Sequence, residues 1–172
     1  LAQGGTADVP LLDNIEGAGF EVAGGVTLSL PSASSYDQAS TGNGQFRYWK
    51  VSGPNSRLDL SQLTRITGGT HYNSRLFLET WAGGTIDLSQ VTTIADAATG
   101  DTRYRSMELV TEGVGGRIDL SSLTEFSDRN AGGTGVDLSS ALTARFGGEI
   151  ILPATGATTF QGVTLTADTQ GR

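Results

Sequence analysis

The sequence contains no cysteine, only four prolines and a single histidine among its 172 residues. The absence of cysteine excludes a disulfide framework and any thiolate metal site. With one histidine, and no ligand spacing around it, the pattern of a zinc centre is also missing. No apolar run approaches the ~20 residues that a helix needs to cross a bilayer, so we expect no membrane insertion.

Positive charge is also scarce, with 11 Lys and Arg against 18 Asp and Glu and a net charge of −7. Nucleic-acid binding depends on clustered basic side chains, so we expect no nucleic-acid partner. Charged residues make up only 17% of the chain, which lacks the charge excess typical of disorder. The sequence opens at Leu1 without a signal-peptide pattern, and we expect a module excised from a larger protein.

A four-residue phrase recurs along the chain and organises it. The phrase reads apolar–polar–Leu–Ser, and its clearest copies carry aspartate in the second position. Copies begin at Val26, Leu58, Ile86, Ile118 and, more loosely, Ile150. Their spacings of 32, 28, 32 and 32 residues indicate a repeat architecture. One further copy, at Val136, falls out of register with the others.

Each period is predicted to contain only strands and turns. An alternating segment such as Trp49-Lys50-Val51 precedes a turn rich in glycine or in asparagine and serine; the phrase and a tail such as Leu63-Thr64-Arg65-Ile66 follow. No window shows helical spacing. We therefore predict an all-β parallel β-helix (β-solenoid) of about five coils with 28–32-residue repeats, on the order of 24 Å tall.

We expect one β-solenoid domain over residues 1–172. It would comprise an N-terminal cap or linker at 1–19, stacked coils at 20–163 and a C-terminal tail at 164–172. The repeated phrase resembles the coils of right-handed parallel β-helix proteins, the fold of pectate-lyase-like enzymes and large secreted bacterial adhesins. This resemblance covers Phe20 to Val163 and is architectural, without a catalytic motif of that family. The Leu-Thr-x-Ile tail also resembles leucine-rich repeats, but the double glycines and the missing helix fit them less well.

The aspartates of the phrase are predicted to form one outward row. Alternation turns Ile86 and Leu88 inward and Asp87 outward, and stacking places Asp59 and Asp119 about 4.8 Å to either side. Capping of the following turn is the favoured role, and pairing with Arg57 or Arg117 is the next alternative. We expect no cofactor, although Ca²⁺ bridging and a carboxylate cluster for catalysis remain open.

Loops inserted at one point of successive coils should gather on one side of a solenoid. Tyrosines, arginines and aspartates concentrate there, and such side chains suit a carbohydrate polymer. Covering of the coil edges is the simpler alternative. The candidate ligand-binding residues in these loops are Tyr36, His71, Tyr72, Arg75, Asp101, Arg103, Tyr104 and Arg105.

A second candidate surface comes from the last strand of each period. Alternation places Tyr48 and Phe77 outward in one row, with Trp81 outward near the glycine turn. An exposed aromatic strip of this kind typically contacts a ligand or a neighbouring module. Coverage of the strip by the N-terminal segment or a loop is the alternative.

These features favour a noncatalytic extracellular module, secreted or at the cell surface, that binds polysaccharide through its loops. The alternative is a structural or adhesive spacer of a large bacterial surface protein. A polysaccharide lyase or hydrolase is the third hypothesis, because the only local acid–base set is Asp101 with Arg103 or Arg105.

Overall fold

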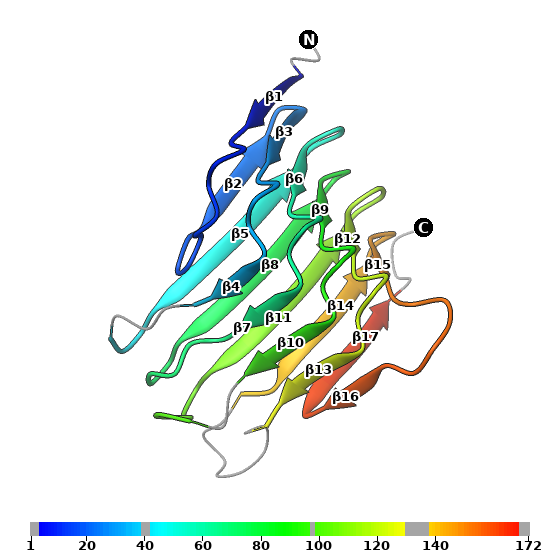
Figure 1. Cartoon of the computed structure of the whole chain (residues 1–172). Coiled ribbons are helices and arrows are strands. Elements are labelled where there is room, and N and C mark those ends of the chain that lie inside the picture. Colours follow the sequence, from blue (N-terminus) through cyan, green and yellow to red (C-terminus); the bar gives the residue numbers. More distant parts are fainter. Residues whose placement is uncertain (1–3, 39–41, 97–98, 130–137, 169–172) are drawn as a thin grey trace.

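The chain is an all-β parallel β-solenoid, as the computed structural model shows (Figure 1). The structure describes residues 4–38, 42–96, 99–129 and 138–168. Within these ranges, three parallel sheets form the walls of the solenoid, and we call them sheets A, B and C. The same ranges contain no helix that could span a membrane.

Sheets A and B each have six strands, and sheet C has five. Sheet A consists, in spatial order, of β1 (Gly5–Asp8), β3 (Val26–Ser29), β6 (Arg57–Asp59), β9 (Thr85–Asp87), β12 (Arg117–Asp119) and β15 (Glu149–Ile151). Sheet B consists of β2 (Phe20–Ala23), β5 (Phe46–Ser52), β8 (Arg75–Trp81), β11 (Ser106–Glu112), β14 (Ser140–Arg145) and β17 (Val163–Asp168). Sheet C consists of β4 (Ser35–Asp37), β7 (Arg65–Thr67), β10 (Thr93–Asp96), β13 (Glu125–Asp128) and β16 (Thr159–Gln161).

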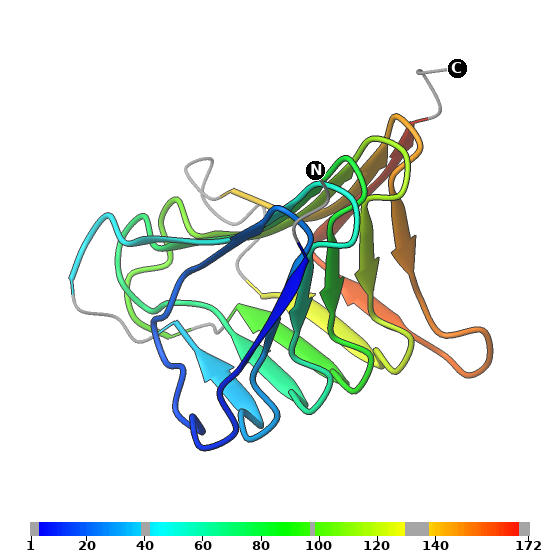
Figure 2. The same ribbon diagram turned by 90° about the horizontal axis from the view of Figure 1, so that it is seen from above.

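The chain visits the sheets in the order B, A, C in every coil, and Figure 2 shows the coils one behind another. Five successive strand triplets, from β2–β4 to β14–β16, agree closely with the predicted number of coils. The segment predicted as a cap or linker contributes β1, which pairs with β3. The segment predicted as a tail continues β17, which pairs with β14 and lengthens the stack beyond residue 163.

Apolar side chains from the three sheets fill the interior in columns that run along the solenoid. The sheet B column joins Phe20, Trp49, Leu78, Leu109, Leu142 and Leu165. The sheet A column joins Leu58, Ile86, Ile118 and Ile150. Each coil therefore covers the apolar side chains of the coil before it. A coil without neighbours would leave these side chains exposed.

The predicted register is confirmed for four copies of the repeated phrase and wrong for one. Leu58, Ile86, Ile118 and Ile150 are paired as expected. In the first coil, however, Leu28 rather than Val26 is the partner of Leu58. A shift of two residues leaves every side chain on its original face, so alternation alone cannot detect it. The first two residues of the copy that begins at Val136 lie outside the described ranges.

Two of the turns between sheets B and A need glycine because they lie against the backbone of the preceding coil. A Cβ atom on Gly84 would lie 2.3 Å from the carbonyl oxygen of Val51. The equivalent Gly148 would place a Cβ atom 2.7 Å from the carbonyl oxygen of Thr111. No side chain fits at such distances, so these glycines permit the coils to stack closely.

Buried polar side chains at the ends of the sheet C strands hold the loops that lead back to sheet B. Gln38 donates from Nε2 to the carbonyl oxygens of Gln45 and Arg75, both at 3.0 Å. Asp128 accepts from the backbone N–H and the hydroxyl of Ser140 at 2.8 and 2.9 Å. These contacts satisfy buried polar groups and fix the loop geometry on one side of the stack (left in Figure 2).

Candidate functional site

The aspartate row of sheet A has the structural role that the sequence favoured. Asp59, Asp87 and Asp119 pair in register on neighbouring strands. Each Oδ1 accepts from the backbone N–H two residues ahead, at 3.1, 3.0 and 3.0 Å. These are the predicted turn-capping bonds.

Arginines compensate the charge of the same row. Arg57 forms an ion pair with Asp87 of the next coil, and Arg117 forms one with Asp119 at 2.9 Å. Burial acts to raise the pKa of Asp119, but the hydrogen bonds from Ser121 and Arg117 outweigh it and lower that pKa. Within the described ranges, no group of three or more His, Asp or Glu side chains is arranged to hold a metal ion. The row therefore stabilises the coils through capping and ion pairs.

Two of the predicted ligand-binding residues lie in the interior. Tyr36 belongs to β4, where it pairs with Ile66 and is fully buried. Its ring contacts that of Trp49 edge-on with centroids 4.8 Å apart, and burial raises its pKa. The segment Ala33-Ser34-Ser35-Tyr36 has the same pattern as the coil tail, which is the signal that the loop assignment overlooked.

Arg105 is the second of these, and it is 2% exposed. Its guanidinium pairs with the buried carboxylate of Asp96 at 3.4 Å and donates to the carbonyl oxygen of Thr99 at 2.8 Å. Neither Tyr36 nor Arg105 can contact a ligand on the surface in this conformation. The alternation of β11 carries this signal, because Arg105 stands two residues before the buried Met107 and four before Leu109 and so has the inward parity of that strand.

Four other predicted residues form one cluster on the loop side, which we call the loop cluster: Tyr72, Asp101, Arg103 and Tyr104. The rings of Tyr72 and Tyr104 meet edge-on at 5.5 Å, and the Arg103 guanidinium lies 5.1 Å from the centre of the Tyr72 ring. Arg103 donates from Nε and Nη2 to the two carboxylate oxygens of Asp101, at 2.9 and 2.6 Å. This bidentate bond lowers the pKa of Asp101 to about 2.

Backbone bonds between coils hold the loop cluster in place. The N–H of Asn73 donates to the carbonyl oxygen of Arg103 at 2.9 Å, and that of Asp101 donates to Thr70 at 3.0 Å. A Cβ atom on Gly100 would lie 2.0 Å from the Thr70 carbonyl oxygen, so the two loops are in direct backbone contact. Two predicted loop residues remain: His71 is exposed next to this cluster, and Arg75 lies at the start of β8.

The second predicted surface lies on the outer face of sheet B, and we call it the aromatic strip: Phe46, Tyr48 and Phe77. Tyr48 and Phe77 pair in register, and their rings stack with centroids 4.9 Å apart and an interplanar angle of 10°. Phe46 contacts Phe77 edge-on at 6.3 Å. Phe46 and Tyr48 are 41% and 38% exposed, so neither the N-terminal segment nor a loop buries the strip.

Charged side chains surround the aromatic strip. The Lys50 ammonium lies 4.5 Å from the centre of the Tyr48 ring, and the Arg75 guanidinium lies 4.8 Å from that of Phe77. Arg75 was predicted in a loop, but it begins β8 and pairs with Glu108 of the next coil. Burial raises the pKa of Glu79; Lys50 opposes this shift and Glu108 adds to it.

Trp81 ends β8 on the same outer face and pairs with Ser52 and Glu112. It is separated from Phe77 by one further outward position of β8, that of Glu79, and is partly buried. Phe46 was missing from the sequence-based candidates, although its separation of two residues from Tyr48 already places it on the same face. The strip is therefore shorter toward Trp81 and longer toward the loops than predicted.

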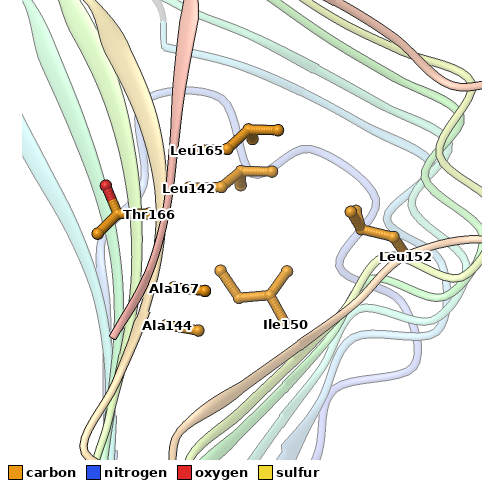
Figure 3. Close-up of a pocket in the computed structure, with 7 residues that line it drawn as sticks. All are labelled: Leu142, Ala144, Ile150, Leu152, Leu165, Thr166 and Ala167. Carbon is orange, nitrogen blue, oxygen red and sulfur yellow. The ribbon is translucent and has the colours of Figure 1, made fainter. Parts of the chain in front are cut away.

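An apolar pocket of about 240 Å³ opens at the C-terminal end of the interior (Figure 3). Leu142, Leu165, Ile150 and Leu152 point into it, whereas Thr166 points away (Figure 3). Leu142 and Leu165 belong to the sheet B core column, and Leu165 is 54% exposed. The lining offers no polar group to orient a ligand, so this pocket is the open end of the core columns.

No protein-family model matches the sequence, and no curated protein or solved structure matches it.

Proposed function

We propose that the protein is a noncatalytic, extracellular module that binds a polysaccharide on its loop side and the adjoining outer face of sheet B. The observation that carries this proposal is the parallel stack of Tyr48 and Phe77 on the outer face of sheet B, in which Tyr48 is 38% exposed. Aromatic faces and edges of this kind offer apolar contact to the C–H faces of sugar rings. Uncovered aromatic groups on a surface are typical of interaction sites.

The side chains around the strip supply the polar part of such a site. Lys50 and Arg75 lie over the two stacked rings, and Glu79 and Glu108 lie beside them in the outward rows. Ammonium and guanidinium groups donate to sugar hydroxyls, and carboxylates accept from them. Polar groups at fixed positions next to apolar rings provide the orientation that ring contact alone lacks.

The loop cluster supports the same proposal from the neighbouring edge. The loops that carry Tyr72 and Tyr104 lead directly into β8 and β11 of sheet B. Their two rings are held by Arg103 and by backbone bonds, so little conformational entropy would be lost on binding. A polymer that crosses from the strip to the loops would contact aromatic rings in both places.

A binding role accounts for Asp101 better than catalysis does. Its bidentate bond to Arg103 and its pKa of about 2 keep it ionised, whereas a general acid needs a raised pKa. Asp101 then serves to orient Arg103 against Tyr72. We therefore propose the protein as a binding module rather than as a lyase or hydrolase.

A glycan array with the intact domain tests the proposal. We expect binding that weakens by about tenfold in Tyr48→Ala, Phe77→Ala or Tyr72→Ala, since each loses one ring contact. Phe146→Ala is the matched control, because Phe146 is 41% exposed at a turn between sheets B and A, outside the strip. Absence of binding to every glycan would favour a structural spacer, and release of unsaturated or reducing ends would favour an enzyme.

A further inference from the structure

The aromatic strip ends at a position without a side chain. Tyr48 has Phe77 on one side, and on the other side its neighbour in sheet B is Gly19, just before β2. A Cβ atom on Gly19 would lie 3.1 Å from the backbone oxygen of Tyr48, which places the two residues side by side. The stack of rings therefore stops one strand short of the edge of the sheet.

A hollow of about 370 Å³ lies at this step. Gly19, Glu21, Phe46, Tyr48 and Lys50 are among the residues that line it. It forms because β2 begins at Phe20, whereas β5 begins at Phe46 and extends three residues further toward the loops, with Phe20 paired to Trp49.

The spacing of neighbouring strands limits the thickness of a ring that can fit in the hollow. Tyr48 and Phe77 stack at 4.9 Å, which is close to the ~4.8 Å separation of neighbouring strands. A flat ring that lies above Gly19 would occupy the next position of the same stack. Tyr48 would contact one face of this ring, and the Lys50 ammonium, which lies 4.5 Å from the centre of the Tyr48 ring, would turn aside to donate to the ligand.

Charged side chains of both signs line the hollow. Glu21 is exposed and pairs in register with Lys50, and Arg47 also lines the hollow, with its Nε and Nη1 already donating to Gly17, Gln45 and Phe46. Glu21 therefore offers an acceptor, and Lys50 a donor, next to the position above Gly19. Residues 1–46 contain five acidic side chains and no lysine or arginine. An acidic polymer that continued past Lys50 and Arg47 toward the N-terminal segment would meet Glu21 and no further basic side chain, whereas a neutral polymer would meet no such repulsion.

We propose that the hollow above Gly19 binds one pyranose ring of a neutral polysaccharide, stacked on Tyr48 and hydrogen-bonded by Glu21 and Lys50. This inference rests on the proposed function and adds its subsite and its ligand class. It places the primary contact on sheet B and gives the loop cluster a secondary role.

Amide chemical-shift titration of the wild-type domain tests the subsite without any risk of misfolding. We would use cellohexaose as the neutral probe and hexagalacturonate as the acidic probe. The subsite predicts shifts at Gly19, Glu21 and Tyr48 with cellohexaose, and weaker binding of hexagalacturonate. Shifts confined to Tyr72 and Tyr104 would overturn the subsite while leaving the proposed function intact. Tighter binding of the acidic probe would overturn the ligand class, and no shifts with either probe would overturn the subsite, whereas the glycan array decides the proposed function.

Two substitutions sharpen the test. Gly19→Leu fills the vacant position and should weaken cellohexaose binding by about tenfold, while the Tyr48 ring remains in place. Glu21→Lys replaces the acceptor and should invert the preference toward hexagalacturonate. Phe146→Ala again serves as the control and should leave both affinities unchanged. Wild-type affinity in folded Gly19→Leu would contradict the subsite.

Discussion

Arg105 and Asp96 form an ion pair of 3.4 Å in which both side chains are at least 98% buried. The pair joins the end of β10 to the loop before β11, and the Arg105 guanidinium also donates to Thr99. Burying two charges is costly, and their attraction offsets this cost only while both are present. The two side chains therefore stabilise this loop only when both are present.

Removing one partner of this pair should destabilise the fold strongly. We expect Asp96→Ala or Arg105→Ala to cost about 3–5 kcal/mol in free energy of unfolding, because each leaves one uncompensated buried charge. Urea denaturation followed by circular dichroism measures this. Arg103→Ala, which breaks the exposed pair with Asp101, is the control and should leave the urea midpoint nearly unchanged. An equal loss of stability in Arg103→Ala and in the variants of the buried pair would contradict the stabilising role of that pair.

Gly84 should not tolerate a side chain. A Cβ atom there would lie 2.3 Å from the Val51 carbonyl oxygen, so Gly84→Ala must push two coils apart, at a cost of about 1–3 kcal/mol or more. Gly5→Ala is the matched control, since no atom lies within 4 Å of its added Cβ. Thermal unfolding of the two variants compares them directly, and a similar midpoint for both would be inconsistent with the close approach.

Ala82 stands in a backbone conformation that favours glycine. Its φ is 46°, and the first turn residues after the neighbouring strands β5 and β11, Gly53 and Gly113, have φ of 86° and 81°. We expect Ala82→Gly to raise the free energy of unfolding by up to about 1 kcal/mol, through relief of this strain. Chemical denaturation measures the change, and a loss of stability would mean that the Ala82 methyl group contributes more than the strain costs.

Asp87 should show that its two contacts are separable. Asp87→Asn keeps an oxygen that can accept from the Ser89 N–H but loses the ion pair with Arg57. Asp87→Ala loses both, and we expect it to cost about 1 kcal/mol more than Asp87→Asn, the value of one hydrogen bond. Thermal denaturation at low and high salt separates the two contacts. Added salt screens the ion pair and should narrow the difference between wild type and Asp87→Asn, but it should leave the difference between the two variants unchanged.

Glu79, which lies beside the aromatic strip, should make the free energy of unfolding depend on pH. Its pKa is raised in the folded protein, chiefly by burial, so the folded state holds this proton more tightly than the unfolded chain. Its favourable contribution is complete below the unfolded pKa of about 4.3 and disappears as pH rises through the higher folded pKa. Glu79→Gln should therefore be more stable than wild type at pH 7 but not at pH 4. Urea denaturation at both values checks this, and equal differences at both would contradict it.

The aromatic strip shows which structural features the alternation of a strand sequence predicts and which it does not. Because side chains of a strand point to opposite faces in turn, the sequence placed Tyr48 and Phe77 outward and in one row. The same alternation places Phe46 on this face, two residues before Tyr48, but it could not show that the rings stack or that Gly19 leaves a gap beside them. These depend on where β2 begins relative to β5, which is a property of the assembled sheet.

The sequence by itself determined the solenoid, its coil period, the inward and outward faces and the capping role of Asp59, Asp87 and Asp119, because these follow from local alternation and spacing. Only the tertiary structure decided the register of Val26, since a shift of two residues preserves every face. It also decided the pairing of Arg105 with Asp96 and the stacking of Tyr48 on Phe77, because contacts between elements of different coils and loops are not encoded by any local pattern.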